Sequence, residues 1–115
     1  MGYPKVRITN TTGYRASGEV RYASLFCEDD TYTDLEPGAT WIGPDRGVCL
    51  VTQISAVIKT ASQDIWATPY RSSGTSYSLY AILAISDTEF EVTRRTSGHE
   101  DVIPADYVEP TEKQK

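Results

Sequence analysis

The stretch GVCLVTQISAVIKT, residues 47–60, is the longest weakly polar run in the chain. β-Branched residues are frequent throughout it, which favours an extended strand. A helix would also gather several of its apolar side chains on one side. Turn-forming residues flank the run, however, at Arg46-Gly47 and at Ser62-Gln63-Asp64, and they favour the strand. Alternate residues then form the face predicted to point into the core: Val48, Leu50, Thr52, Ile54, Ala56 and Ile58.

Shorter alternating runs surround this predicted central strand. We expect a first strand at residues 5–9, short enough to lie at a sheet edge, and a long second strand at 16–26 with Val20, Tyr22 and Phe26 in the core. Further extended segments are expected at residues 31–35, 40–42, 65–68, 75–86 and 89–95.

Turns are predicted between these runs. Glu36-Pro37-Gly38-Ala39 is typical of a tight turn, with proline fixing φ and glycine supplying a positive φ at the next position. Residues 71–74, Arg-Ser-Ser-Gly, are interpreted as a loop, and 89–95 as an antiparallel partner of 75–86.

Seven or eight short strands with turns between them and no convincing helix predict an all-β fold, a single antiparallel β-sandwich. A barrel is the alternative. The 115 residues suit one domain spanning 1–115. Because the tail carries prolines and mixed charge, we expect it to fray from about residue 108.

Composition narrows the classes of function. The chain is 39% hydrophobic and 23% charged, as is usual for a folded globular protein. A net charge of −5 disfavours nucleic acid as a partner, since binding to phosphates needs clustered basic residues. There is no signal-peptide pattern and no apolar run near the ~20 residues of a membrane span. We therefore expect a soluble protein, cytoplasmic or secreted by a non-classical route.

Cys27 and Cys49 permit one disulfide without requiring it. Without a secretion signal we favour two partly buried thiols, with a cross-strand bridge as the alternative. Asn10-Thr11-Thr12 matches an N-glycosylation sequon, but Asn10 is interpreted more simply as a turn residue.

The chemistry-bearing residues do not form a recognisable catalytic or metal motif. His99 stands alone in a predicted loop, and its distance in sequence from the two cysteines disfavours a zinc site. Glu28, Asp29, Asp30 and Asp34 form an acidic cluster, interpreted as a solvated turn with a weak calcium site as the alternative. We expect no catalytic residue, no metal and no cofactor, so an enzyme is the least favoured class.

Aromatic residues are the more informative feature. The chain has eight Tyr and two Trp but only two Phe, a bias toward rings with a polar edge that suit interfaces and sugar stacking. One interpretation has Trp41 and Trp66 capping the two ends of the core. The other has Trp66, Tyr70 and Arg71 on an exposed loop that contacts a glycan, a lipid headgroup or a protein. The candidate ligand-binding residues are Trp66, Tyr70, Arg71 and Trp41.

The order of segments over residues 5–95 resembles the C-terminal membrane-binding β-sandwich of cholesterol-dependent cytolysins. VRITN at 6–10 precedes GYRA at 13–16, as that family's first strand precedes a Gly-Ala-Tyr-Val-Ala-like entry to the second. Residues 54–60 run into 61–70, which hold Trp66, as a later strand there runs into a Trp-rich membrane loop. Because this loop has one Trp and no Cys, the resemblance implies a sandwich whose end loops touch a surface, without cholesterol recognition or pore formation. The lipid-binding aegerolysin sandwiches are a comparable analogy.

These observations lead to two functional expectations. The first is a non-enzymatic binding module that recognises a membrane lipid or glycan surface through aromatic end loops. The second is a protein-interaction or structural subunit, such as an inhibitor or a component of an assembly or homo-oligomer, that uses a sheet face or an edge strand.

Overall fold

The computed structural model describes residues 5–23, 27–44, 49–75 and 77–95. Within these ranges the chain forms strands and no helix, so no helix there is long and apolar enough to cross a membrane. The strands are β1 (Arg7–Asn10), β2 (Arg15–Tyr22), β3 (Asp30–Leu35), β4 (Thr40–Ile42), β5 (Val51–Ile54), β6 (Val57–Lys59), β7 (Asp64–Trp66), β8 (Tyr70–Thr75), β9 (Leu79–Ala84) and β10 (Phe90–Arg94).

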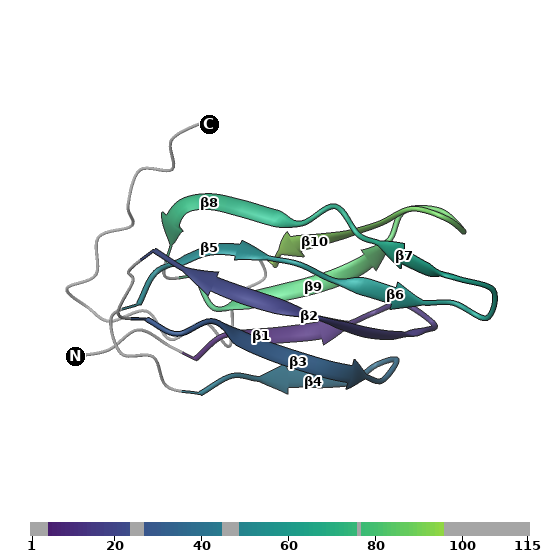
Figure 1. The fold of residues 1–115 in the computed structure, drawn as a ribbon, viewed down its shortest axis with the longest axis horizontal. Helices are drawn as coiled ribbons and strands as arrows, with labels where there is room; N and C mark the ends of the chain where they lie inside the picture. Colours follow the sequence, from purple (N-terminus) through teal and green to yellow (C-terminus); the bar gives the residue numbers. More distant parts are fainter. Residues whose placement is uncertain (1–4, 24–26, 45–48, 76, 96–115) are drawn as a thin grey trace.

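The strands form two sheets that pack face to face (Figure 1). One sheet has the order β10-β9-β1-β4. The other has the order β7-β6-β2-β5-β8, with β3 paired to the second edge of β2. Apart from β1 with β9, the named strands pair antiparallel. The predicted all-β sandwich is confirmed, with ten described strands where seven or eight were expected.

The predicted central strand is present but broken into β5 and β6. Both segments pair with the same edge of β2: Val20 lies opposite Ile54 and Ala16 opposite Ile58. The break falls at residues 55–56. The chain then turns at 60–63 and returns as β7 and β8, which makes one long, bent hairpin (Figure 1).

The break and a second irregularity alter which residues point inward. Ile54, Ala56 and Ile58 are buried as predicted. The pairing of β5 with β8 shifts register after Val51, and Val51 is buried where Leu50 and Thr52 were expected. A one-residue slip exchanges the faces of a strand, so a simple alternation could not place this part of the run.

Gly18 on β2 allows the hairpin to approach at the break. A Cβ added to Gly18 would lie 1.9 Å from the carbonyl oxygen of Ser55 and 2.6 Å from the hydroxyl of Tyr32. The approach is held by two hydrogen bonds, in which the Ser55 amide donates to the Glu19 carbonyl at 3.0 Å and the Glu19 amide donates to Ser55 Oγ at 3.1 Å. A side chain at position 18 is therefore incompatible with this packing.

Two predictions about strand positions are wrong, for the same reason. β1 was expected at a sheet edge but lies between β9 and β4, and residues 71–74 were expected to be a loop but lie inside β8. The Ser-Gly composition of β8 is overridden by its ladder with β5, where Ser72 Oγ also donates to the Val51 carbonyl at 2.7 Å. Strand position depends on partners that are distant in sequence.

Asn10 organises the turn after β1. Its side-chain amide donates to the carbonyls of Tyr14 at 2.7 Å and Leu35 at 2.9 Å, and its Oδ1 accepts from the amide of Thr12 at 3.0 Å. The residue is fully buried. Asn10 itself is the last residue of β1, and its side chain stabilises the turn that follows, so the interpretation as a turn residue holds for the side chain alone. Its side-chain amide is buried and hydrogen-bonded.

Both open sides of the sandwich are bridged. On one side the predicted turn from β3 to β4 crosses between the sheets, with Gly38 at φ 79° and the Ala39 amide donating to the Glu36 carbonyl at 2.9 Å. On the other side Thr68, between β7 and β8, bonds to β10: its amide donates to the Phe90 carbonyl and its carbonyl accepts from the Val92 amide, each at 2.8 Å. The sheets are thus linked along both sides.

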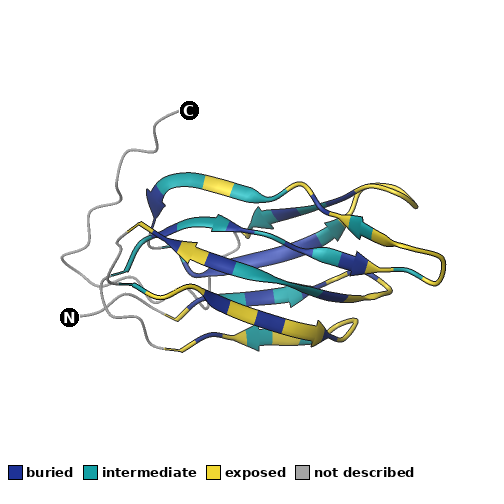
Figure 2. Cartoon of the chain, viewed as in Figure 1, coloured by how far each residue is buried: buried dark blue, intermediate teal, exposed yellow. Residues whose placement is uncertain are grey.

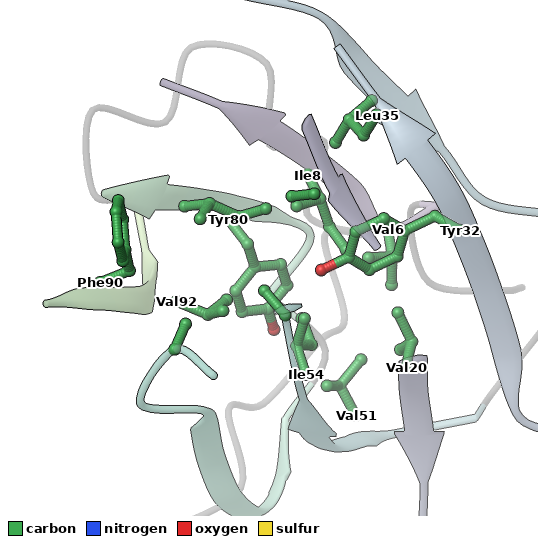
Figure 3. Close-up of a cluster of buried hydrophobic side chains, with 14 of the residues drawn as sticks. Val6, Ile8, Val20, Tyr32, Leu35, Val51, Ile54, Tyr80, Phe90 and Val92 are labelled. Atoms are coloured by element: carbon green, nitrogen blue, oxygen red, sulfur yellow. The ribbon is translucent and has the colours of Figure 1, made fainter. Parts of the chain in front are cut away.

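The core lies between the two sheets, where side chains from both point toward one another (Figure 3). Figure 2 shows buried positions along the strands of both sheets. The predicted core residues Val20 and Tyr22 are buried, whereas Phe26 lies outside the described residues. The core cluster consists of Val6, Ile8, Ala16, Val20, Tyr22, Tyr32, Leu35, Val51, Ile54, Ala56, Ile58, Ala67, Tyr80, Ile82, Phe90 and Val92.

Cys27 and Cys49 form a disulfide, with their Cα atoms 6.1 Å apart. The favoured expectation of two thiols is therefore wrong. The bridge joins the segment that leads into β3 to the segment that leads into β5, and neither cysteine is in a strand. The topology brings the two segments together, which their separation of 22 residues alone could not show.

We expect Gly18→Ala to lower the free energy of unfolding by about 3 kcal/mol, because the added methyl would overlap the Ser55 carbonyl. Urea unfolding followed by tryptophan fluorescence measures the loss. Gly13→Ala is the matched control, since a Cβ there meets nothing within 4 Å and should change stability by less than about 0.5 kcal/mol. Equal effects of the two substitutions would contradict the close approach.

Removing the disulfide should lower the free energy of unfolding by about 3 kcal/mol, the loop-closure value for two cysteines separated by 22 residues. The comparison is between the wild type and a Cys27→Ser, Cys49→Ser double variant in urea, each with and without a reductant. The reductant should bring the wild type to the stability of the variant and leave the variant unchanged. A wild type that is insensitive to the reductant would show that the bridge does not contribute.

Candidate functional site

The structure does not bring the four predicted site residues together. Trp66 and Arg71 point outward from the six-stranded sheet, and the Trp66 side chain is 72% exposed. Tyr70 is half-buried, with its ring 5.0 Å from that of Tyr80. Trp41 is in β4 of the other sheet, also half-buried, with its ring 5.7 Å from that of Tyr32.

These positions agree only in part with each of the two interpretations of the tryptophans. Trp41 packs against the core cluster, as a capping residue would. Trp66 does not, because most of its surface is exposed. It belongs to β7 and not to an end loop, so its position is set by the ladder with β6.

Cross-strand pairing arranges the outer face of the six-stranded sheet in rows. One row runs Ser17, Val57, Trp66, since Ser17 is opposite Val57 and Val57 is opposite Trp66. A second row runs Arg21, Gln53, Arg71. Residues that are opposite in neighbouring strands point to the same side of a sheet. The indole therefore stands at the end of an otherwise polar surface.

This face is hollowed. A depression of about 530 Å³ crosses β3, β2 and the β5–β6 break and reaches Trp66 on β7. Arg71 lies on the same face but outside the hollow. The lining residues are Ser17, Gly18, Glu19, Arg21, Thr31, Tyr32, Thr33, Gln53, Ser55, Val57 and Trp66.

The bottom of the hollow is rigid because it is built on the strand break. The Tyr32 hydroxyl donates to the Ser55 carbonyl at 2.5 Å, passing over the position where Gly18 has no side chain. Burial raises the pKa of Tyr32, so the hydroxyl stays protonated and continues to donate.

Charges beside the hollow are largely compensated. Arg21 Nε lies 3.3 Å from Glu19 Oε1 and 3.9 Å from Asp29 Oδ2, with all three side chains about half exposed. Pairs of this kind add little stability in water. Their effect on the site is to present donors and acceptors in fixed positions with little net charge.

Trp66 also borders a second hollow, of about 320 Å³. Its other lining residues are Ile85, which is 55% exposed, and Thr68, Thr88, Glu89, Phe90 and Glu91. The bridge from Thr68 to β10 lies among these residues. Trp66 thus lines both hollows.

The acidic cluster is only partly the solvated turn that was expected. Asp30 is buried at the start of β3, where its Oδ2 accepts from the Tyr22 hydroxyl at 2.7 Å. Asp29 is exposed and close to Arg21, and Asp34 is exposed with φ 53°. Among the described residues, no group of three or more His, Cys, Asp or Glu side chains could hold a metal ion. His99 lies outside them.

Sequence reasoning missed the polar half of the site. Glu19 and Arg21 are in β2, Gln53 is in β5 and Ser55 is in the break that follows β5, more than thirty residues from β2. Only the pairing of β2 with β5 places them on one surface. Their alternation with buried residues was a usable signal that they face outward. It could not reveal which of them are neighbours.

The fold and the site together define an all-β, two-sheet protein with a hollowed sheet face and an exposed tryptophan at its rim. Comparisons with protein families, curated proteins and solved structures found no match to the chain.

The buried Tyr32 hydroxyl predicts alkaline sensitivity. Because its pKa in the folded state lies above the unfolded value of about 10, stability should be complete below about pH 10 and fall as the pH rises above it. Tyr32→Phe should be less stable at neutral pH, by about 1–3 kcal/mol for the lost buried hydrogen bond, but should decline less steeply above pH 10. Urea midpoints between pH 7 and pH 11 test this, and parallel declines of both proteins would contradict it.

Proposed function

We propose that the chain is a carbohydrate-binding protein that holds a neutral oligosaccharide in the hollow of the six-stranded sheet, with Trp66 as a stacking platform. The observation that carries the proposal is the exposed indole on a strand at the rim of a depression of about 530 Å³ that both apolar and polar groups line. The surface for recognition is thus the sheet face, in place of the end loops that the sequence suggested.

An indole suits a sugar ring because both present a flat apolar face with polar groups around it. Trp66 is held by the antiparallel ladder of β7 with β6, and Val57 lies beside it as its cross-strand partner. The backbone of the platform is therefore fixed before a ligand binds, which reduces the entropy lost on binding.

The remaining lining residues complement hydroxyl groups. Glu19, Arg21 and Gln53 have planar ends that can form two hydrogen bonds each, while Thr31, Thr33 and Ser55 offer single hydroxyls. Sites of this kind combine an apolar surface with a few placed polar groups that fix orientation. Because Glu19, Arg21 and Asp29 largely offset one another, an uncharged ligand is favoured.

Charge argues against a membrane lipid surface as the primary ligand. Interfacial binding is strongest when basic residues accompany the aromatic ones, because cytoplasmic leaflets are anionic. Here Glu89 and Glu91 line the hollow beside Trp66, and the chain as a whole carries −5. An anionic membrane would therefore repel this part of the protein.

The proposed activity is binding without bond cleavage. Hydrolysis of a glycosidic bond usually requires two carboxyl groups that flank it. Glu19 is the one carboxylate that lines the sheet hollow within the described part of the chain, and it is paired with Arg21.

The position of the indole also indicates which length of oligosaccharide should bind best. Trp66 lines both hollows, so a linear chain stacked on it can extend to either side. We therefore expect longer oligosaccharides to bind more tightly than disaccharides of the same sugar.

Isothermal titration calorimetry with cellohexaose, chitohexaose, xylohexaose and maltohexaose tests the proposal. At least one should bind, and Trp66→Ala should weaken it about tenfold, because a lost stacking contact costs roughly 1 kcal/mol or more. Trp66→Phe should retain part of the affinity. Ile42→Ala is the matched control, since Ile42 is an exposed apolar residue, 56% accessible, on the other sheet.

Other outcomes would contradict the glycan assignment. Binding to phosphatidylcholine vesicles that is lost in Trp66→Ala would identify a membrane surface. A stable protein complex or homo-oligomer that Trp66→Ala disrupts would support the interaction-subunit alternative. Sugar binding that is unaffected by Trp66→Ala would place the site elsewhere on the protein.

A further inference from the structure

The outer face of the four-stranded sheet carries two arginines that flank one apolar position. Arg7 on β1 pairs with Leu79 on β9, and the Arg95 amide, directly after β10, donates to the Leu79 carbonyl at 2.9 Å. β10, β9 and β1 are consecutive in the sheet, so the two arginines are two strand spacings apart, roughly 10 Å between backbones. Both border a hollow of about 170 Å³.

Leu79 forms the floor of this hollow. It is 4% exposed although it alternates with the core residues Tyr80 and Ile82 and is not itself part of the core cluster. A guanidinium group is weakly hydrated and packs readily over apolar surface. A charge placed over Leu79 is less screened by water than one on an open surface, which strengthens its attraction for an anion.

Two threonines complete the lining. Thr9 and Thr40, opposite each other on β1 and β4, have their hydroxyl oxygens 2.8 Å apart. In such a pair one hydroxyl donates to the other, and the accepting hydroxyl keeps its own hydrogen free. The hollow therefore offers one neutral O–H donor beside the two guanidinium groups.

Arg7 and Arg95, like Arg71 on the other sheet, differ from Arg15, Arg21 and Arg94 in their surroundings. Arg15 pairs with Glu36, Arg21 lies near Glu19 and Asp29, and Arg94 stacks on the Tyr77 ring. No ion pair joins Arg7 or Arg95 to a carboxylate within the described ranges. On β10 the carboxylate of Glu91 is at the opposite end of the strand, across from Leu83.

We propose that this hollow is a binding site for a tetrahedral oxyanion, sulfate or phosphate, held by Arg7 and Arg95 with a hydroxyl of the Thr9–Thr40 pair. Guanidinium groups bind such anions through paired, charge-assisted hydrogen bonds. The volume suits a single small group. The site lies on the opposite sheet from the Trp66 hollow, so it is independent of the proposed glycan binding and stands if that proposal fails.

Titration of ¹⁵N-labelled protein with sodium sulfate and with sodium phosphate, at constant ionic strength set by sodium chloride, tests the site by NMR. The expected result is saturable shifts at the amides of Arg7, Thr9, Thr40 and Leu79. Arg7→Gln and Arg95→Gln should each weaken binding about tenfold or more, as expected for loss of a hydrogen bond from a charged group. Arg7→Lys should bind more weakly than wild type, because an ammonium lacks the two-pronged geometry.

Arg15→Gln is the matched control, since it removes the same charge from an exposed strand position on the other sheet and should change affinity less than about twofold. Glucose 6-sulfate and glycerol 3-phosphate distinguish the sources of the anion. Esters that bind as tightly as the inorganic ions assign the site to a group on a larger molecule, and weaker esters assign it to the free ion; both results support the site. Shifts that chloride reproduces, or equal weakening in Arg15→Gln, would overturn it.

Discussion

The hydrogen bond from Tyr32 to the Ser55 carbonyl, made over the missing side chain of Gly18, is the contact on which the six-stranded sheet depends. It joins β3 to the break between β5 and β6 across β2, so three segments meet at one point. A carbonyl that leaves its ladder at a strand break needs another donor, because buried polar groups are costly without one. Because Gly18 has no side chain, the Tyr32 hydroxyl can reach the Ser55 carbonyl, and this contact stabilises the bend of the hairpin.

The bend has consequences beyond local packing. It lets one continuous stretch of chain pair with β2 at both ends, while its return, β7 and β8, stays in the same sheet and bonds to β10 of the other sheet at Thr68. That bridge links the sheets on the side opposite the β3–β4 turn. The bend also places Trp66, paired with β6, next to the hollow. The candidate site therefore depends on the break between β5 and β6, which an unbroken strand would not have.

The two faces of the sandwich are chemically different. The outer face of the six-stranded sheet has an exposed indole and a hollow where Arg21 lies near Glu19 and Asp29, which suit a neutral ligand. The outer face of the four-stranded sheet has two arginines without a carboxylate partner among the described residues, which suit an anion. Net charge alone, at −5, would not have suggested an anion site. The distribution of charge over the sheets is what distinguishes them.

Alternation of apolar and polar residues was enough to determine from the sequence that the chain is all-β and that Val20, Tyr22, Ile54 and Ile58 are buried. The Pro37-Gly38 pair was enough to place a turn. These are local properties, since side-chain direction and turn conformation depend on a few adjacent residues. The tertiary structure decided the rest: the interior position of β1, the strand identity of 71–74, the bond between Cys27 and Cys49, and the separation of Trp41 and Tyr70 from Trp66. Each of these depends on which distant segments become neighbours. Alternation repeats every two residues in every strand, so it carries no information about which strands pair.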